Sequence, residues 1–446
     1  MADLAINLCG IKSLNPFWLA SGPPSNSGEQ VMRAFDSGWG GAVWKTIGKP
    51  IVNVSSRLGA VDYSSLPIMG LNNIELITDR PLEVNLKEIY EVKKLYPANA
   101  VVVSLMVESK EEWKDIIRRT EDTGADGLEL NFGCPHGMCE RGMGSAVGQE
   151  PDVLREITSW AKEFATTPVI VKLTPNVTNI LDPGIAAVEG GADAISLINT
   201  IKSIIGVDLE NLVVQPTVGM EGTQGGYCGP AVKPIALHMA GALARDKRIT
   251  VPISGIGGIS NWRDAAEFLA LGSTSVQVCT AVMHYGYRIV EDMIDGLNNY
   301  LDEMKMKSVN NLIGRAVPTF VEWGDLDLNF GVTAKINSKT CIGCQLCYIA
   351  CLDGGHQCIH TRQGSCSAYH GESDHGVNSR TSIKPPVLHI EEHESEVHVP
   401  FVDSSECIGC NLCKLVCPVP ECVTMEEVPS TAGKESWNDR IAKGLT

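Results

Sequence analysis

Residues 250–281 read TVPISGIGGISNWRDAAEFLALGSTSVQVCTA, and this stretch decides the fold. Its two apolar runs, Thr250–Ser254 and Ser275–Cys279, have the length of buried strands. The turn Gly255–Gly258 follows the first run, and Thr280-Ala281 opens a helix after the second. Strands that alternate with helices are typical of a parallel sheet with helices on its faces.

The same alternation extends back to the N-terminus. Amphipathic stretches such as Ser109–Thr123 and Pro151–Ala165 separate further apolar runs. Eight strands spaced in this way predict an α/β fold, a (β/α)8 TIM barrel over residues 1–332, with active groups at the C-terminal strand ends. The expected strands before residue 250 are Phe17–Ala20, Gly41–Lys45, Ala100–Met106, Gly127–Asn131, Pro168–Leu173 and Ala194–Ile198.

The last two strands end in residues suited to an anion. Gly257 and Gly258 offer bare backbone N–H groups, and Cys279-Thr280 begins the next helix. Loops after strands 7 and 8 of such barrels often bind phosphate, using helix N-termini. We therefore expect a phosphate-bearing ligand at this position.

Two cysteine runs near the C-terminus share the spacing Cys-x2-Cys-x2-Cys-x3-Cys. Three thiolates on a short loop can bind one cubane iron–sulfur cluster, while the fourth cysteine of the run binds the other cluster. The spacing predicts one [4Fe–4S] cluster on Cys341, Cys344, Cys347 and Cys417, and a second on Cys351, Cys407, Cys410 and Cys413.

Structural zinc and disulfides are the alternatives, but zinc sites usually pair CxxC units across a longer gap. The runs define a ferredoxin-like α+β domain with two clusters over residues 333–428, and a polar tail follows over residues 429–446. A long insertion at about 354–399 holds seven histidines together with Cys358 and Cys366. We expect a polar excursion there, with a metal role as the alternative.

Composition sets the broad class. The 446 residues, 44% hydrophobic and 20% charged, suit a globular protein with one large and one small domain. A net charge of −17 argues against nucleic acid and anionic membranes and is compatible with a basic redox partner. No apolar run approaches the roughly 20 residues of a membrane span, and the N-terminus shows no secretion signal. Sixteen cysteines without such a signal indicate a reducing, cytoplasmic location.

One cysteine follows the fourth strand, in the segment Glu129-Leu130-Asn131-Phe132-Gly133-Cys134-Pro135-His136-Gly137-Met138. A free thiol has a pKa of about 8.5 and so holds, at neutral pH, a proton that it can release. Cys134 is therefore predicted to be a general acid, whereas Cys139 and His136 could act or merely line the loop. A core position is the simpler interpretation for most of Cys9, Cys228, Cys279 and Cys422.

Polar side chains accompany several strand ends. Lys45 and Lys172 end apolar strands, where a charge is costly unless it is paired. These lysines either form ion pairs with carboxylates or lie near the N1/C2 carbonyl edge of a flavin. Asn73, Asn131 and Asn199 supply amides and Thr200 a hydroxyl. Because an amide donates and accepts together, this set suits a planar ring with alternating N–H and C=O groups.

At these residues the chain resembles the dihydropyrimidine dehydrogenases, from about Ala20 to the last cysteine run. The resemblance implies the catalytic, FMN-containing iron–sulfur subunit of the two-subunit bacterial type. His136 stands where related dihydroorotate dehydrogenases typically have Asn, which favours a pyrimidine without the carboxylate of orotate. The most specific matches are Asn73-Ile74-Glu75-Leu76-Ile77, Cys134-Pro135-His136-Gly137-Met138, Glu140-Arg141-Gly142-Met143-Gly144 and Lys172-Leu173-Thr174-Pro175-Asn176-Val177-Thr178.

The resemblance also implies roles for matching residues. Cys134 would protonate C5 of uracil or thymine while a hydride passes between N5 of FMN and C6. Pyrimidine-binding positions would be Asn73, Asn131, Phe132, Gly133, Asn199 and Thr200. FMN-contacting positions would be Ala20, Ser21, Lys45, Thr46, Lys172, Gly229, Gly257, Gly258, Cys279 and Thr280.

Two positions depart from the family. Gly133 stands where Ser is frequent, which removes a hydroxyl beside the acid, and Leu352 replaces the Pro that often follows a fourth cysteine. No Gly-x-Gly-x-x-Gly motif follows a strand, so nothing in the sequence plainly binds NAD(P) or FAD. The resemblance implies that NAD(P)H and FAD are bound by a partner subunit. The two clusters would relay electrons from that partner to FMN, and the chain would dimerise within a hetero-oligomer.

Two other functions remain open. A ferredoxin-fused dihydroorotate dehydrogenase would turn over orotate rather than uracil. A non-enzymatic electron-transfer subunit, with the barrel as scaffold, would purify without bound FMN.

Overall fold

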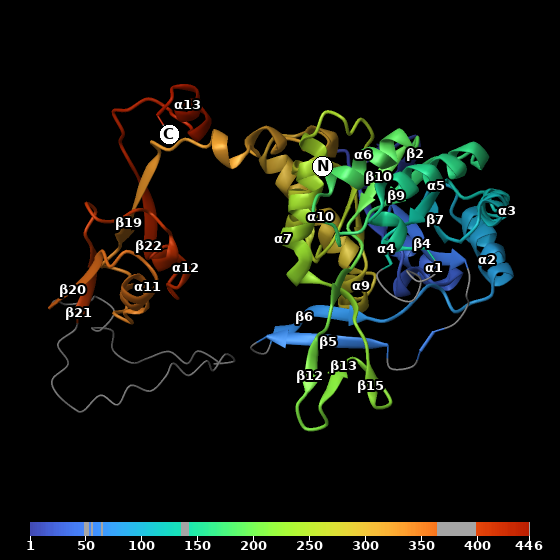
Figure 1. Cartoon of the computed structure of the whole chain (residues 1–446), viewed down its shortest axis with the longest axis horizontal. Helices are drawn as coiled ribbons and strands as arrows, with labels where there is room; N and C mark the ends of the chain where they lie inside the picture. The colour runs from blue at the N-terminus through green and yellow to red at the C-terminus, as the bar shows by residue number, and fades with distance from the viewer. Residues whose placement is uncertain (49–52, 55–56, 64–65, 135–141, 364–397, 446) are drawn as a thin grey trace. The chain divides into compact units, whose positions relative to one another are not determined.

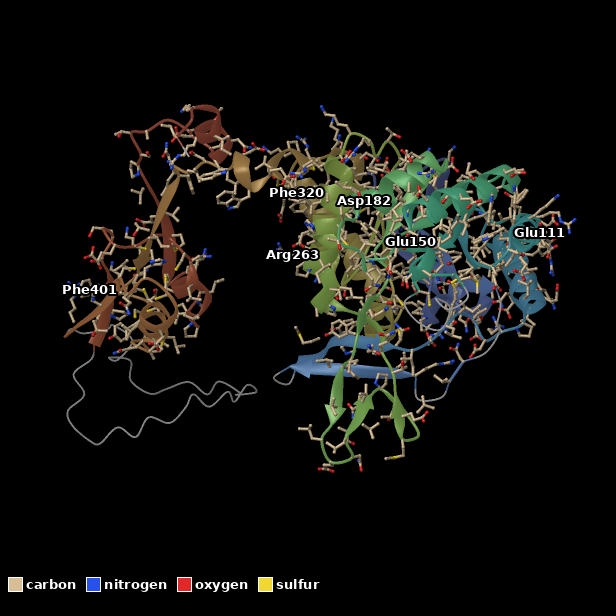
Figure 2. The ribbon with its side chains drawn as sticks, viewed as in Figure 1. Glu111, Glu150, Asp182, Arg263, Phe320 and Phe401 are labelled. Atoms are coloured by element: carbon tan, nitrogen blue, oxygen red, sulfur yellow. The ribbon has the colours of Figure 1, made fainter. Side chains whose placement is uncertain are left out.

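The computed structural model describes residues 1–48, 53–54, 57–63, 66–134, 142–363 and 398–445. The chain divides into two compact units, Met1–Phe320 and Val321–Thr446. The ring of Phe320, labelled in Figure 2, lies 4.7 Å from the guanidinium carbon of Arg245 and 6.2 Å from the ring of His238, which ties the end of the first unit to α7 (Lys233–Arg245).

The first unit is a closed barrel of eight parallel strands with helices between them, which confirms the predicted TIM barrel. All eight expected strands are present, in the order β10-β17-β18-β3-β4-β7-β8-β9 around the barrel. The strands are β3 (Phe17–Leu19), β4 (Gly41–Gly48), β7 (Ala100–Met106), β8 (Gly127–Asn131), β9 (Val169–Lys172), β10 (Ala194–Leu197), β17 (Ile253–Ile256) and β18 (Ser273–Val278).

Helices follow the strands in sequence, as the amphipathic stretches predict. Ser109 caps α3, because its side chain accepts a hydrogen bond from the N–H of Glu112. In return, the carboxylate of Glu112 accepts a hydrogen bond from the backbone N–H of Ser109. The helices of this unit are α1 (Gly28–Ser37), α2 (Leu82–Leu95), α3 (Lys110–Glu121), α4 (Ser145–Gly148), α5 (Pro151–Phe164), α6 (Leu181–Glu189), α7, α8 (Trp262–Ala270), α9 (Thr280–Tyr285) and α10 (Ile289–Glu303).

The seventh strand begins three residues later and ends two residues later than the predicted apolar run Thr250–Ser254. Gly255 and Ile256 pair in register with Val276 and Gln277 of β18, so the strand continues through a glycine that a sequence pattern assigns to the turn. This extension carries the strand end to Gly257, the position where the loop opens.

The barrel interior is apolar except near one end. Every residue of β4 is buried, as expected for a parallel strand covered on both faces. Trp18 and Trp44 are fully buried, and their indole N–H groups donate to Ser13 Oγ at 2.9 Å and Asn85 Oδ1 at 3.0 Å. The polar tips of these large rings are thus satisfied inside the core.

A small antiparallel sheet stands at the C-terminal end of the barrel. Its order is β11 (Ile201–Ser203), β16 (Gly225–Cys228), β6 (Leu66–Asn73) and β5 (Leu58–Tyr63). Figure 1 shows β5 and β6 at this end, with two hairpins beyond them. The hairpin strands are β12 (Gly206–Asp208), β13 (Val213–Gln215), β14 (Thr217–Val218) and β15 (Glu221–Gly222), and a separate N-terminal hairpin is β1 (Ile6–Leu8) and β2 (Ile11–Ser13).

In its described residues, the second unit has two antiparallel strand pairs, three short α-helices and the 3-10 helix η6 (Trp323–Asp325). The strand pairs are β19 (Gly331–Ile336) with β22 (Val423–Val428) and β20 (Ile359–Gln363) with β21 (His398–Val402), where Figure 2 labels Phe401. The helices are α11 (Leu346–Gly354), α12 (Leu412–Leu415) and α13 (Trp437–Ala442).

The segment expected to be a polar tail contains α13. The ring of Trp437 lies 6.4 Å from that of Trp323, and Asn438 Nδ2 donates to Asp325 Oδ1 at 2.8 Å. Residues 321–330 therefore contact the C-terminal segment, which places them in the second unit rather than in the barrel. Within the described residues, no helix combines the length and apolarity needed to cross a bilayer.

Candidate active site and cysteine clusters

A cavity opens among the C-terminal strand ends of the barrel. Its empty volume, counted to the open mouth, is about 1120 Å³. The sequence-predicted residues that line it are Ala20, Ser21, Lys45, Thr46, Asn73, Asn131, Cys134, Lys172, Asn199, Thr200, Gly229, Gly257, Gly258, Cys279 and Thr280.

Both lysines of the cavity are ion-paired. Lys45 Nζ lies 3.2 Å from Glu75 Oε2, and Lys172 Nζ lies 3.5 Å from Glu129 Oε1. The side chains of Lys172 and Glu129 are only 6% and 0% exposed. The ion-pair interpretation therefore holds for both lysines. Each lysine also lines the cavity, where its positive charge can interact with a bound ligand.

The amides of the cavity are linked to one another. Asn131 Nδ2 donates to Thr46 Oγ1 at 2.9 Å, and Asn199 Nδ2 donates to Asn131 Oδ1 at 3.0 Å. The N–H of Thr200 donates to Asn199 Oδ1 at 2.8 Å. Asn73 reaches the cavity from β6, and its amide donates to Gly226 O at 3.1 Å. Each amide retains hydrogen-bonding capacity beyond these contacts, since an amide group has two N–H bonds and two lone pairs.

Cys134 lies at the edge of this polar group, in an apolar environment. Its side chain clusters with Ile77, Met106 and Met143, and the residue is 5% exposed. Its thiol donates to Leu76 O, with Sγ 3.6 Å from the oxygen. The sulfur of Cys134 thus lines the same cavity as the asparagines while contacting apolar neighbours on its other side.

Two residues expected at the pyrimidine do not line the cavity. Phe132 is buried, with its ring 6.4 Å from that of Trp113. Gly133 has no room for a side chain, because a Cβ there would lie 2.3 Å from Asn199 Cβ. At this position, where the family often has Ser, Asn199 therefore packs closely against the backbone and leaves no room for a serine side chain.

The glycine loops form the side of the cavity where the sequence predicted an anion. Gly258 has φ +74°, and a Cβ there would lie 2.8 Å from Lys233 Cβ and 2.9 Å from Gly229 O. Only glycine fits this close approach without strain. The loop thus brings backbone N–H groups next to η3 (Pro230–Val232), the turn that leads into α7.

Three polar residues of the site were not predicted from the sequence. Gln277 and Glu129 are fully buried, and Gln277 Nε2 donates to Glu129 Oε2 at 3.2 Å. Gln277 Oε1 is buried without a hydrogen-bond partner among the described residues, and Gln277 lines the cavity. Glu75 is shared by Lys45 and Arg57. Polar residues inside apolar strands were the available signal for Gln277 and Glu129.

Two further cysteines line the cavity: Cys279, which was predicted to contact FMN, and Cys228, for which a core position was the simpler interpretation. Burial raises the pKa of Cys279 to about 12 and that of Cys228 to about 11. Thr280 Oγ1 donates to Cys228 Sγ at 3.3 Å, and Cys228 in turn donates to Leu71 O at 3.2 Å. Both residues therefore remain neutral thiols at physiological pH and contribute bulk rather than charge.

These residues fit a flavin mononucleotide. Gln277 Oε1 is a buried acceptor with a ring N–H as a suitable partner. The glycine loop beside Gly258 can surround a phosphate, and Lys45 and Lys172 can meet negative charge on the ring.

The cysteine runs of the second unit have matching backbone conformations. Gly343 and Gly409 both have φ +70°, and Gln345 and Asn411 have φ +59° and +69°. Each run leads into a short helix, α11 or α12. The two runs therefore present their thiols in the same local geometry.

The predicted ligands of the first cluster lie around one small pocket. Ile336, Val419 and Val423 form apolar walls there, and the N–H of Gly343 donates to Cys341 Sγ at 3.5 Å. The pocket is lined by Cys341, Cys344, Cys347 and Cys417, the four residues that the spacing predicted.

Of the second set, Cys351 and Cys413 are buried and belong to one cluster of side chains, with Cys407 packed against it. The N–H of Ala334 donates to Cys407 Sγ at 3.5 Å. Cys410 is exposed. The donor set of thiols with backbone N–H groups directed at sulfur fits iron–sulfur clusters.

Some predictions fall outside the described residues. These are His136, Cys139, Cys366 and most of the insertion, residues 364–397. The described parts of the insertion are residues 354–363 and 398–399.

Comparison with known proteins assigns the class. The family model for dihydroorotate dehydrogenase matches residues 3–301, and the chain belongs to this family of oxidoreductases. Within the family, it is 43% identical over 359 residues to the NAD-dependent dihydropyrimidine dehydrogenase subunit PreA of Escherichia coli K12, covering 80% of this chain and 87% of that protein.

Two further relatives match the chain with lower identity. The chain is 40% identical over 337 residues to the chloroplastic dihydropyrimidine dehydrogenase (NADP(+)) of Arabidopsis thaliana, covering 73% of this chain and 79% of that protein. It is 37% identical over 317 residues to the catalytic subunit of dihydroorotate dehydrogenase B (NAD(+)) of Pyrococcus horikoshii, covering 70% and 98%. The resemblance to dihydropyrimidine dehydrogenases is therefore confirmed.

Proposed function

We propose that this chain is the cytoplasmic catalytic subunit of a two-subunit dihydropyrimidine dehydrogenase that interconverts uracil or thymine and the 5,6-dihydropyrimidine. The observation that carries the proposal is the position of Cys134 in one cavity with linked amides and two paired lysines. The dihydropyrimidine dehydrogenase relative from Escherichia coli, named as a subunit, supports it.

In this proposal the chain's residues bind and orient the pyrimidine. Asn73, Asn131 and Asn199 supply donors and acceptors for its N–H and C=O groups, with Thr200 beside them. Because Asn131 and Asn199 bond each other, the substrate meets amides whose orientation is already set. FMN, held beside the pyrimidine by the residues above, would donate or accept the hydride at its N5 atom.

Cys134 acts as the general acid and base of the reaction. In the reduction direction its thiol delivers a proton to C5, and in the oxidation direction the thiolate removes it. Ile77, Met106 and Met143 cover the sulfur and exclude water, so the proton passes to the substrate rather than to solvent.

Two [4Fe–4S] clusters, one held by Cys341, Cys344, Cys347 and Cys417 and the other by Cys351, Cys407, Cys410 and Cys413, would pass single electrons between FMN and a partner. That partner would carry FAD and the NAD(P)H site. The cysteine runs with matching backbone conformations support this assignment.

The test uses the full chain purified with its co-purifying partner. Flavin type, iron content and uracil-dependent NAD(P)H oxidation are measured for wild type, Cys134→Ala and the control Cys9→Ala, which changes a cysteine outside the cavity. Cys134→Ala should retain FMN and iron and lose about 10²–10⁴-fold in turnover, the usual contribution of a general acid. Undiminished turnover in that variant would refute the assignment.

A dihydroorotate dehydrogenase fused to a cluster domain is the second candidate, favoured by the family match over residues 3–301. Orotate turnover that exceeds uracil turnover on the same sample would select it. A preparation without FMN absorbance would instead favour an electron-transfer subunit.

A further inference from the structure

The second unit places one additional cysteine beside each predicted cluster site. Cys358, at the start of β20, is 5% exposed, and its Sγ lies 3.6 Å from Cys351 Sγ. Cys407 packs against the same group of buried side chains as Cys358. Cys358 therefore contacts one predicted ligand of the second cluster and lies in the same group of side chains as another.

The other site has a counterpart. Cys422, just before β22, is 2% exposed and lines the pocket of the first cluster together with Cys341 and Cys417. Its thiol donates to Asn337 O, with Sγ 3.7 Å from the oxygen. Within the described residues, the Cys358 thiol donates no comparable hydrogen bond to a backbone carbonyl. Its side chain is therefore less constrained than that of Cys422.

The distance between the sulfurs of Cys351 and Cys358 shows whether both can reach the same metal ion. Two thiolates on one tetrahedral metal ion lie roughly 3.8 Å apart when each metal–sulfur bond is about 2.3 Å. A sulfur–sulfur distance of 3.6 Å therefore brings both atoms to one metal position. Four cysteines serve the four irons of a cubane, so a single iron there takes one of the two thiols.

We propose that Cys358 is a reserve ligand of the second cluster and competes with Cys351 for the same iron. The exchange breaks the iron–sulfur bond to Cys351, forms one to Cys358, and transfers the thiol proton from Cys358 to Cys351. No electron is gained or lost. This inference rests on the proposed cluster sites and adds a fifth cysteine to one of them.

The experiment compares four variants of the full chain, purified without oxygen: Cys351→Ala, Cys358→Ala, the double variant, and Cys410→Ala. The last removes an exposed ligand of the same cluster for which the described residues record no second sulfur in contact. Iron and acid-labile sulfide are measured per chain, and electron paramagnetic resonance detects three-iron clusters. FMN content reports whether the barrel is folded.

Wild type should contain about eight irons. Cys351→Ala and Cys358→Ala should each keep about eight and show no three-iron signal. The double variant should resemble Cys410→Ala, with about one iron lost as a three-iron cluster or about four lost as a whole cubane.

Loss of iron from Cys351→Ala to the level of Cys410→Ala would overturn the inference, because no reserve ligand would then exist. Loss of iron from Cys358→Ala alone would also overturn it, since Cys358 would be an obligatory ligand. Wild-type protein without iron–sulfur clusters would instead reject the proposed function itself.

Discussion

Lys172 and Glu129 form a buried ion pair at the base of the cavity, with Nζ 3.5 Å from Oε1 and the carboxylate fully shielded from solvent. Glu129 Oε2 also accepts from Ser196 Oγ at 2.8 Å and from Gln277 Nε2 at 3.2 Å. The carboxylate thus links the cation of one strand to polar groups of two others.

Glu129→Gln should lower the free energy of unfolding of the barrel by about 3–5 kcal/mol, because it leaves a buried ammonium without its counter-charge. Thermal unfolding followed by tryptophan fluorescence measures the change, since Trp18 and Trp44 are core residues. Lys110→Met, which removes an exposed partner of Glu163, is the control and should cost at most about 1 kcal/mol. Equal effects of the two changes would contradict the structural role of Glu129.

Asn199→Ala should reduce kcat/KM for uracil by roughly 5–150-fold, the equivalent of about 1–3 kcal/mol for an unsatisfied buried polar group. The variant removes both a ligand amide and the contact that orients Asn131. Steady-state kinetics at several uracil concentrations measure the loss. Asn211→Ala, on the exposed β12–β13 hairpin, provides the comparison and should leave kcat/KM unchanged. An unaltered value for Asn199→Ala would remove this residue from the proposed site.

Gly258→Ala should weaken FMN binding at least tenfold. The new Cβ combines a left-handed backbone conformation, which costs about 1–2 kcal/mol, with a 2.8 Å contact to Lys233 Cβ that displaces the loop. Fluorescence titration of flavin-depleted protein with FMN gives the dissociation constant. Gly219→Ala has a similar φ of +64° but nothing within 4 Å, and so reports backbone strain alone. Equal FMN affinity in both variants would argue that the phosphate lies elsewhere.

Cys279 should react slowly with iodoacetamide at pH 8 and faster as pH rises. Burial raises its pKa from 9.0 to about 12, so the thiolate fraction at pH 8 falls by roughly a thousandfold. Peptide mass spectrometry after labelling at pH 8, 9 and 10 measures the rate, with guanidinium-unfolded protein as the reference. A rate in folded protein that levels off near pH 9 would contradict the raised pKa.

The same shift predicts a pH dependence of stability. The folded state binds the thiol proton of Cys279 more tightly than the unfolded state does, so the stabilisation is fully present below pH 9. It is lost progressively as pH rises from about 9 towards 12. Denaturant unfolding at pH 8 and pH 10, compared for wild type and Cys279→Ala, tests this; the variant should lose less stability over that interval than wild type.

Local pattern was sufficient for much of the fold. The barrel strands are short and apolar, and helices with capping residues such as Ser109 separate them, so both the elements and their order could be read along the chain. The end of β17 could not be, because Gly255 pairs in a strand only when β18 lies beside it. The helix α13 was missed for a similar reason, since it is packed against Trp323 from a distant part of the sequence.

Some residues of the candidate site could likewise be predicted from the sequence, and others could not. Cys134, the lysines and the asparagines could be chosen because polar residues at apolar strand ends are unusual. Gln277, Glu129 and Glu75 lie inside elements or beside partners whose proximity depends on barrel closure. Phe132 was matched to a motif, but its side chain turns into the core against Trp113.

The sequence by itself determined which chemical groups the chain carries, which apolar runs form the barrel strands, and the two repeated cysteine spacings, because these depend on residues close together in the chain. Only the tertiary structure decided which groups meet: the Lys172–Glu129 pair, the linked amides, and the 3.6 Å approach of Cys358 to Cys351. Barrel closure joins segments that are far apart in the sequence, and the turn after α11 brings Cys358 back to Cys351 although only seven residues separate them. Sequence spacing carries no measure of either distance.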